Sequence, residues 1–247
     1  MTGVGGAIRI RQISIHGAEI LAVFDLHVHT VKGSSDSSLT PAELIAEAER
    51  IGLDGVCLTE HGGGWESPEL AAAFGDAGIT VIPALEVDTE MGHVLVFGMR
   101  RYVAGMHKIG ELRRAVNRAG GVMISAHPFR NLFNKEPYNN NLLYRNGLAR
   151  PETAVEASAH PLFEVVDDIE VVNGSNTQQE NLFSTGVARS LGLPGTGGSD
   201  VHSTHGLGRC VTVFDSDVKS ESDLVEAIKA RAYRPGEEYN TGNLRIV

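Results

Sequence analysis

The segment Ile20-Leu21-Ala22-Val23-Phe24-Asp25-Leu26-His27-Val28-His29-Thr30 decides the fold, because it joins a short apolar run to two histidines one residue apart. The run Ile20 to Phe24 predicts a buried β-strand, and side chains two residues apart on a strand point to the same face. The imidazoles of His27 and His29 are therefore expected to converge at the end of this strand. Imidazole is the commonest metal ligand, so the pair predicts half of a metal site, with two unrelated surface histidines as the alternative.

Outward from this strand, apolar runs and amphipathic helical segments alternate about seven times over the 247 residues. Strands are expected near residues 55–59, 80–85, 94–97, 121–125, 168–172, 193–199 and 210–214. Helices are expected after the cap Thr40 as far as Gly52, near 68–74 and 108–119, from the cap Asn176 (with Gln179 at its third position) to 191, and from the cap Ser220 to about 231. This alternation predicts one α/β domain over residues 1–247 with a mainly parallel sheet. A distorted TIM-like (β/α)7 barrel fits that length better than an open doubly wound sheet.

Two parts of the chain depart from the alternation. Residues 1–19 predict a small β-hairpin that leads into the first core strand. Residues 131–162 form an Asn-rich, irregular insertion, and loops of this length in a compact domain are usually functional or mobile. We expect this insertion to act as a lid or a pocket wall.

The composition limits the classes of function. A net charge of −10 and a pI near 5.4 argue against a broad basic surface for nucleic acid. No secretory signal and no apolar run of ~20 residues is visible, so no membrane span is expected. Cys57 and Cys210 lie in apolar runs and predict buried thiols, which fits a cytoplasmic location.

Metal-ligating residue types collect at the ends of the predicted strands. They are His27, His29, His61, Glu86, His127, Asp200 and His202. The carboxyl ends of parallel barrel strands share the face that holds the active site, so these side chains predict one metal cluster. Asp36, in the loop after the first strand, is close enough to contribute. His93 begins a strand, so either that strand is antiparallel or His93 reaches the site from a loop.

These residues lie in motifs that resemble those of the PHP superfamily, which groups polymerase-associated and histidinol-phosphatase domains. The motifs are Asp25-Leu26-His27-Val28-His29-Thr30, Thr59-Glu60-His61-Gly62, Ala84-Leu85-Glu86, Gly92-His93, Ala126-His127-Pro128 and Gly198-Ser199-Asp200-Val201-His202. They occur in family order and cover about residues 22 to 215. The resemblance implies a distorted (β/α)7 barrel that holds two or three divalent ions.

The resemblance also implies a ligand set. His27, His29 and Asp200 would hold one ion, and Glu86 would bridge it to a second ion held by His93 and His127. Asp36, His61 and His202 would form a third site. Asp25, Glu60 and Asn173 would support these ligands. Two departures from the family pattern bear on the third site: Glu60 stands where Asp is usual, and Asp36 lies further from His29 than is usual. Mixed imidazole and carboxylate sites accept Mn, Fe or Zn.

The chemistry expected from such a site is the hydrolysis of a small phosphate ester. Three divalent ions would outweigh the charges of Asp36, Glu86 and Asp200, which suits a phosphate. A hydroxide bridging two ions would attack phosphorus, with no side-chain nucleophile. The substrate would be a phosphomonoester, such as histidinol phosphate or a nucleotide, or a phosphodiester. Arg130 is the expected bidentate phosphate ligand, and His205 and Arg209 are further candidates.

Two other functions remain open from the sequence. The same ions could activate water against an amide-type bond, although Arg130 favours phosphate. A regulatory module that binds a metal or ligand without turnover is the other alternative, and the full set of ligands argues against it.

Overall fold

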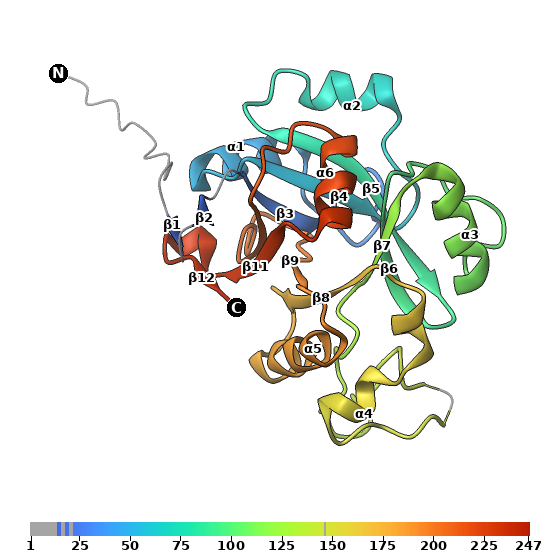
Figure 1. Ribbon diagram of the computed structural model, residues 1–247. Helices are drawn as coiled ribbons and strands as arrows, with labels where there is room; N and C mark the ends of the chain where they lie inside the picture. The colour runs from blue at the N-terminus through green and yellow to red at the C-terminus, as the bar shows by residue number, and fades with distance from the viewer. Residues whose placement is uncertain (1–13, 16–17, 20–21, 146) are drawn as a thin grey trace.

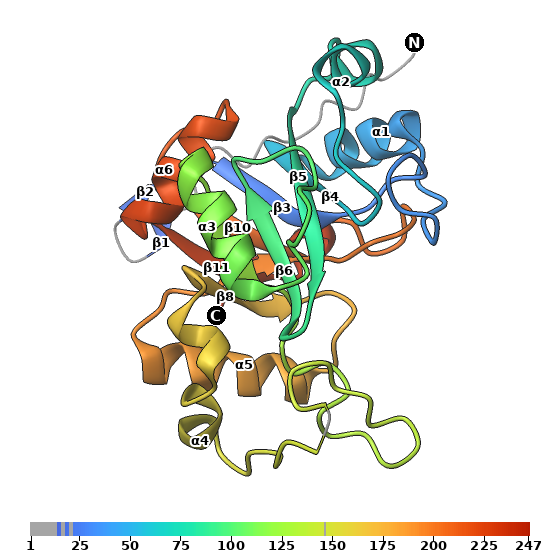
Figure 2. The ribbon, with the colours of Figure 1, turned by 90° about the vertical axis from the view of Figure 1, so that its right-hand side faces the viewer.

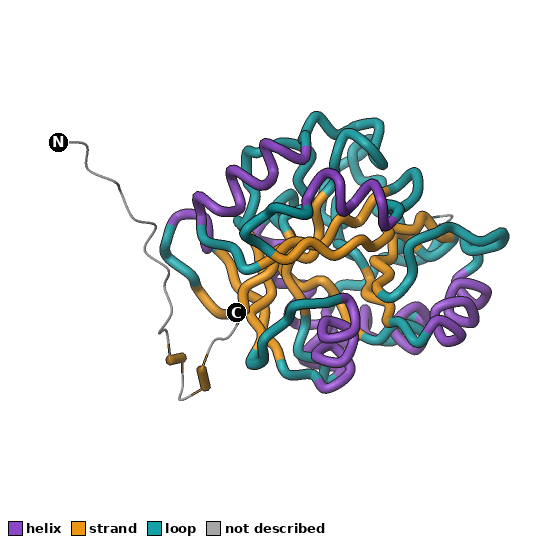
Figure 3. Tube along the Cα trace, turned by 90° about the horizontal axis from the view of Figure 1, so that it is seen from above, coloured by secondary structure: helices purple, strands orange, loops and turns teal. Residues whose placement is uncertain are grey.

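The protein was examined as a computed structural model, which describes residues 14–15, 18–19, 22–145 and 147–247. Its centre is a curled ten-stranded sheet with the order β12-β11-β10-β3-β4-β5-β6-β7-β8-β9 (Figures 1 and 3). The strands of this sheet are β3 (Ala22–Val28), β4 (Gly55–Glu60), β5 (Thr80–Thr89), β6 (Gly92–Phe97), β7 (Val122–Ser125), β8 (Asp168–Asn173), β9 (Thr196–Gly198), β10 (Cys210–Phe214), β11 (Tyr233–Glu237) and β12 (Arg245–Ile246). Every residue of β3 and β4 is buried, as expected for strands covered on both faces.

The curled sheet closes on itself at the end of β3. Val28 pairs in parallel with Val201, just after β9. Two backbone hydrogen bonds complete the seam, from Asp200 N to His27 O at 2.7 Å and from His29 N to Val201 O at 3.0 Å. Strands β3 to β9 therefore form a distorted TIM-like barrel, and the predicted fold class is confirmed. The seam also carries His27, His29 and Asp200 to one place.

The expectation of a mainly parallel sheet needs correction. Strand β6 is antiparallel to both β5 and β7, and β10, β11 and β12 also pair antiparallel. Strand β6 runs antiparallel to β5 because a tight turn joins the two strands. Thr89 Oγ1 stabilises this turn: it donates to Gly92 O at 2.6 Å and accepts from Met91 N at 3.1 Å. His93 thus belongs to an antiparallel strand, one of the two placements expected for it. Strand β11 follows the last helix and was not expected.

The described chain has six α-helices (Figure 2). They are α1 (Pro41–Ile51), α2 (Ser67–Phe74), α3 (Ile109–Ala119), α4 (Ala154–Ser158), α5 (Gln178–Leu191) and α6 (Glu221–Ala230), with two short 3₁₀ helices, η1 (Pro161–Glu164) and η2 (Tyr239–Thr241). Five of the α-helices cover the sheet, and α4 packs against α5. Apolar faces of α1 and α2 pack with β3 and β4, α6 packs over β3 to β7, and α3 and α5 pack with β5 to β8. None of the described helices is long and apolar enough to cross a membrane.

Helix α5 starts one residue later than its sequence indicates. Thr177 is the N-cap: its side chain accepts from Glu180 N, and the Glu180 carboxylate accepts from Thr177 N at 2.8 Å. This reciprocal capping box outcompetes the predicted cap Asn176. The Asn176 side chain instead accepts a hydrogen bond from Arg130 Nε at 3.0 Å.

Short elements occur in both parts of the chain that depart from the alternation. The insertion at 131–162 contains the short helix α4 and the start of η1, and the rest is turns and loop. In the predicted N-terminal hairpin, β1 (Ser14–Ile15) pairs antiparallel with β2 (Ala18–Glu19). Residues 1–13, 16–17 and 20–21 lie outside the described chain.

A buried carboxyl joins β8 to β11 and makes stability depend on pH. Asp168 accepts hydrogen bonds from Tyr233 Oη, Ile169 N and Gly195 N, yet burial raises its pKa from 3.8 to about 6. Between these values the unfolded chain has already lost a proton that the folded protein keeps, so this group makes stability fall as pH rises. Replacing Asp168 with Asn removes that dependence.

The expected result is that the free energy of unfolding of Asp168→Asn, relative to the wild type, rises by up to about 3 kcal/mol between pH 4 and pH 7. Urea unfolding of both proteins across this range measures it. Burial also raises the pKa of Asp25 to about 6. Asp25 is present in both proteins, so its contribution cancels in the difference between their free energies of unfolding. Parallel pH profiles for the two proteins would show that Asp168 titrates normally.

Candidate metal centre

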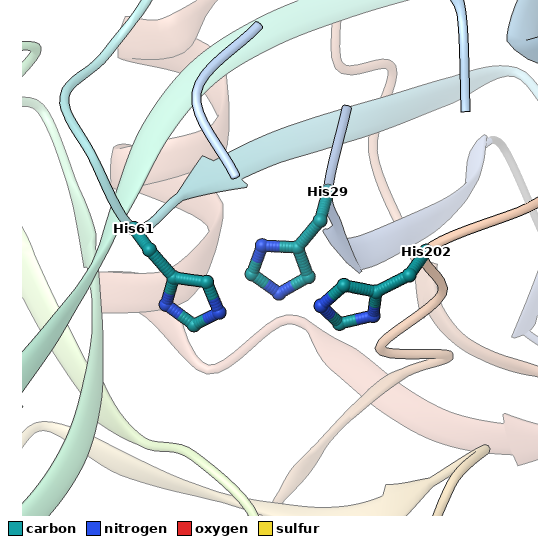
Figure 4. Close-up of side chains that lie close together, drawn as sticks. All are labelled: His29, His61 and His202. Carbon is teal, nitrogen blue, oxygen red and sulfur yellow. The ribbon is translucent and has the colours of Figure 1, made fainter. Parts of the chain in front are cut away.

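Imidazoles from three chain segments meet at the end of the barrel where β3, β4 and β9 finish. Figure 4 shows His29 from the segment after β3, His61 from the segment after β4 and His202 from the loop after β9. The ring of His29 stacks between the other two, with centroids 4.4 Å from each. The strand-end position of each histidine thus gives one compact group.

Glu86 on β5 lies at the middle of the cluster and is buried. Its carboxylate oxygens lie within 3.3 Å of nitrogens of His27, His29, His61, His93 and His127. Oε1 faces His93 Nδ1 at 2.8 Å and His127 Nε2 at 3.0 Å. Oε2 faces the other three imidazoles. A carboxylate shared in this way has the geometry of a bridge between two cation positions.

Asp200 forms the other acidic wall of the cluster. Its Oδ1 lies 3.5 Å from His27 Nε2 and 3.3 Å from His29 Nε2, and its Oδ2 is 2.5 Å from Arg130 Nη2. The Asp200 backbone has a φ of +54°, a conformation that non-glycine residues adopt rarely. The barrel seam holds it there through the bond from Asp200 N to His27 O, which aims the carboxylate at the histidines.

Hydrogen bonds on the far side of His27 decide which of its nitrogens carries the proton. His27 Nδ1 lies 2.9 Å from Glu170 Oε1. A carboxylate can only accept, so Nδ1 must donate and the neutral ring presents the lone pair of Nε2 to the cluster.

The same reasoning applies to His29. Its Nδ1 lies 3.0 Å from Ser34 Oγ, and Ser34 Oγ donates its only proton to Glu60 Oε2 at 2.7 Å. Ser34 must therefore accept from His29, which again leaves the lone pair on Nε2. In the described chain both Nε2 atoms are buried without a hydrogen-bond partner.

Lone pairs of His27 and His29 therefore face the carboxylates of Glu86 and Asp200 inside the protein. This arrangement is repulsive unless positive charge sits between the groups. The shifts in pKa also indicate that positive charge is favoured between these groups. Burial disfavours the charged ring, yet the Asp200, Glu170 and Glu86 carboxylates raise the pKa of His27 well above its usual range. Burial would also raise the pKa values of Glu86 and Asp200, but the histidines around them hold both well below the usual range.

Among the residues that the structure describes, potential ligand atoms form three groups compact enough to hold a metal ion. They are His27, His29 and Asp200; His27, Glu86 and His127; and His29, His61 and His202. The first group is the set that the family resemblance implies. In the second, His27 accompanies Glu86 and His127, while His93 touches Glu86 from a quarter-exposed position. In the third, His29 takes the place expected for Asp36. Asp36 lies at the open rim, with Oδ2 3.3 Å from His202 Nε2 and 3.9 Å from His61 Nε2.

The expected supporting residues surround the cluster in different ways. Asp25 accepts from His27 N, Ser199 N and Gly208 N, so it ties both sides of the barrel seam together. Glu60 turns away from the ligand atoms and accepts from Thr30, Ser34 and Trp65.

Asn173 and Arg130 form one network beside Asp200. Arg130 Nη2 donates to Asn173 Oδ1 at 2.8 Å as well as to Asp200. The predicted phosphate ligand Arg130 is thus held at the edge of the cluster. His205 and Arg209 are not brought to it: they line a separate polar groove of about 960 Å³, where Arg209 Nη1 donates to Gly174 O.

Two residues that orient the cluster were missed from the sequence. Glu170 Oε1 accepts a hydrogen bond from His27 Nδ1. Its Oε2 accepts from His127 N at 2.8 Å and from Asn173 Nδ2 at 2.9 Å. A carboxylate within the apolar run Asp168 to Val172 was the available signal, because a buried charge needs partners. Ser34 gave no signal among the four serines of its loop.

Comparison with known proteins identifies the family of the chain. The family profile described as "PHP domain" matches residues 25–148, half of the chain, and the profile described as "PHP-associated" matches residues 178–233. The chain belongs to the PHP family. The resemblance noted from the motifs is therefore confirmed. Among curated proteins, none matches the chain.

Solved structures share the fold at low sequence identity. A two-domain protein from Bacteroides vulgatus, described as containing a predicted PHP-like metal-dependent phosphoesterase, is 20% identical with a TM-score of 0.61 over 94% of this chain and 69% of that one. An amidohydrolase from Chromobacterium violaceum is 17% identical (TM-score 0.57, 83% and 96% covered). A lesion-specific endonuclease from Pyrococcus furiosus is 18% identical (TM-score 0.52, 91% and 57% covered). At these identities the likeness to these structures concerns the fold.

Membership of the PHP family and the geometry of the cluster both indicate a site for divalent metal ions. The family implies divalent ions, and the described residues supply three groups of imidazole and carboxylate atoms suited to them. The buried, unpartnered Nε2 atoms of His27 and His29 are the feature that fits a cation best.

Proposed function

We propose that the protein is a metal-dependent phosphoesterase that hydrolyses a small phosphate ester, either a monoester or a diester. The observation that carries this proposal is the pair of buried imidazole lone pairs on His27 and His29, aimed at the carboxylates of Glu86 and Asp200. Arg130 stands directly beside this group with its side chain partly open to solvent.

We propose three ligand roles in this reaction. His27, His29 and Asp200 would hold one ion, and Glu86 would be shared with a second position that includes His127 and His93. His61 and His202, with Asp36 at the rim, would hold a third. Divalent ions bound there would make water a nucleophile near neutral pH and neutralise charge on the phosphate oxygens.

The side chains around the cluster would then position the substrate. The Arg130 guanidinium has five N–H donors in a planar fork that matches two phosphate oxygens. In the described chain its Nη2 binds Asp200 and Asn173, so part of the fork is already fixed in direction. A phosphate at the open side of the cluster would meet this preoriented donor.

A panel of substrates tests the proposal. Purified protein loaded with Mn, Zn or Fe is assayed on phosphomonoesters, phosphodiesters and amides, with and without a chelator. We expect chelator-sensitive release of phosphate or of a monoester product. Protein that contains metal yet hydrolyses only amides would overturn the proposal in favour of the alternative hydrolase, and metal-loaded protein without any turnover would favour a binding module.

Arg130→Ala separates substrate binding from metal binding. Loss of charge-assisted hydrogen bonds worth about 1.5–3 kcal/mol should raise KM for phosphate esters about 10- to 100-fold. Metal content should stay unchanged, because Arg130 supplies no ligand atom. Arg189→Ala, which removes an exposed arginine from α5, is the matched control. If Arg130→Ala loses metal instead, Arg130 serves to hold Asp200 and not the substrate.

A further inference from the structure

A small cavity opens beside the cluster on the side of His93 and His127. Its volume is about 150 Å³. Its wall surface is mainly apolar and comes from Met91, Ala126, Pro128, Leu142 and Leu143, with the polar side chains of Ser125, Asn131, Asn140 and Asn141 between them. His93, His127 and Arg130, which belong to the cluster or adjoin it, also line the cavity, and none of the residues that line it is a carboxylate. The cavity therefore adjoins the cluster, and Arg130 is the one permanently charged side chain among the described residues in its wall.

The far wall of this cavity belongs to the insertion and is fixed in place by one buried side chain. Asn141 Nδ2 donates to Pro128 O and Arg130 O, both at 2.8 Å, while Asn141 Oδ1 accepts from Leu143 N and Tyr144 N. All the hydrogen-bonding groups of this side chain are used to hold the wall against the segment after β7. Figure 2 shows this insertion loop below the turn that joins β5 and β6. The cavity is therefore formed before any ligand enters.

One polar atom in the cavity wall has no partner in the described chain. Ser125 Oγ is buried and unpaired, although buried hydroxyls normally find a hydrogen-bond partner. Ser125 also lines the cavity. An unsatisfied hydroxyl in a pocket whose wall surface is mainly apolar is the type of group that orients a bound ligand.

We propose that this cavity holds the organic group of the phosphate ester and selects a single six-membered ring. A cavity of about 150 Å³ has the volume that a benzene ring needs. The ring would lie between Met91 and Leu142, its phosphate would face Arg130, and Ser125 would bind one polar atom of the ring system. This inference rests on the proposed function and names its substrate class: phosphate esters of uncharged, monocyclic aromatic groups.

The kinetic test fills the cavity. Leu142 is only partly buried, so Leu142→Trp should fold while its larger side chain occupies the space. We compare kcat/KM of variant and wild type on phenyl phosphate and on methyl phosphate, because the ratio for each substrate cancels its own reactivity. We expect a loss of about tenfold or more on phenyl phosphate and less than about twofold on methyl phosphate. Leu182→Trp, at an exposed position of α5, should change neither. Equal losses on both substrates, or none, would overturn the inference.

A binding test separates the inference about the cavity from the proposed esterase function. Phenol and toluene are titrated into metal-free protein and followed by NMR. Both should bind the wild type and fail to bind Leu142→Trp, and Ser125→Ala should weaken phenol several-fold while leaving toluene unchanged. If no ester is hydrolysed but this pattern holds, the cavity stands and the esterase proposal fails. If esters are hydrolysed but both compounds bind wild type and Leu142→Trp alike, the cavity inference fails alone.

Discussion

Glu86→Gln is expected to lower hydrolysis about a thousandfold and to remove at least one equivalent of bound metal. The carboxylate of Glu86 faces five imidazoles, with two at Oε1 and three at Oε2. An amide keeps the shape but offers only one weaker, uncharged acceptor, so Glu86 could no longer be shared between two cation positions. A Lewis-acid ion supplies several kcal/mol to a phosphoryl reaction, which corresponds to about three powers of ten in rate.

Metal analysis and kcat on the best ester measure this effect. Glu226→Gln, an exposed glutamate on α6, is the matched control and should behave as the wild type. Circular dichroism checks that Glu86→Gln is folded. A folded variant with full metal content and full activity would show that Glu86 is needed neither for metal binding nor for hydrolysis.

Glu170→Gln is expected to weaken metal binding about 10- to 100-fold without touching any ligand atom. Three donors converge on this carboxylate: His27 Nδ1 on Oε1, and His127 N with Asn173 Nδ2 on Oε2. Glutamine has one acceptor oxygen, so at least one of these buried donors would face an NH₂ group. His27 would lose the orientation that points Nε2 at the cluster, and the unpaired donor would cost about 1–3 kcal/mol.

Competition with a chelator gives the metal dissociation constant of this variant. Glu164→Gln, an exposed position on η1, is the control. A positioning role predicts weaker metal binding together with a lower kcat that recovers at high metal concentration. An unchanged dissociation constant would mean that Glu170 only stabilises the fold.

The clustering of the metal-ligating residue types could be predicted because the backbone alone brings them together. His27 lies on β3 and His29 directly after its last residue, and the end of a strand is fixed by the apolar run before it. The barrel seam then brings Asp200 to the same point, and seam and strand ends follow from the fold class. For His93 the sequence left two alternatives, because this residue begins its predicted strand. Either that strand runs antiparallel to its neighbours, or His93 reaches the site from a loop.

The parts that could not be predicted depend on tertiary contacts between distant side chains. The cap of α5 is an exception: Thr177 and Glu180 form a local capping box that the sequence contains, whereas the contact of Asn176 with Arg130 could not be predicted from it. Ser34 matters because its one proton goes to Glu60 and thereby fixes the tautomer of His29. No pattern in a serine-rich loop contains that information. The cavity beside His93 likewise depends on how Asn141 folds the insertion back.

Anomalous diffraction from crystals of the protein grown with manganese tests the central claim most directly. The account predicts anomalous peaks at coordination distance, about 2.0–2.2 Å, from His27 Nε2 and His29 Nε2, with Glu86 shared between two neighbouring peaks. Crystals in which these two nitrogens contact no anomalous scatterer, while manganese occupies other sites, would contradict it.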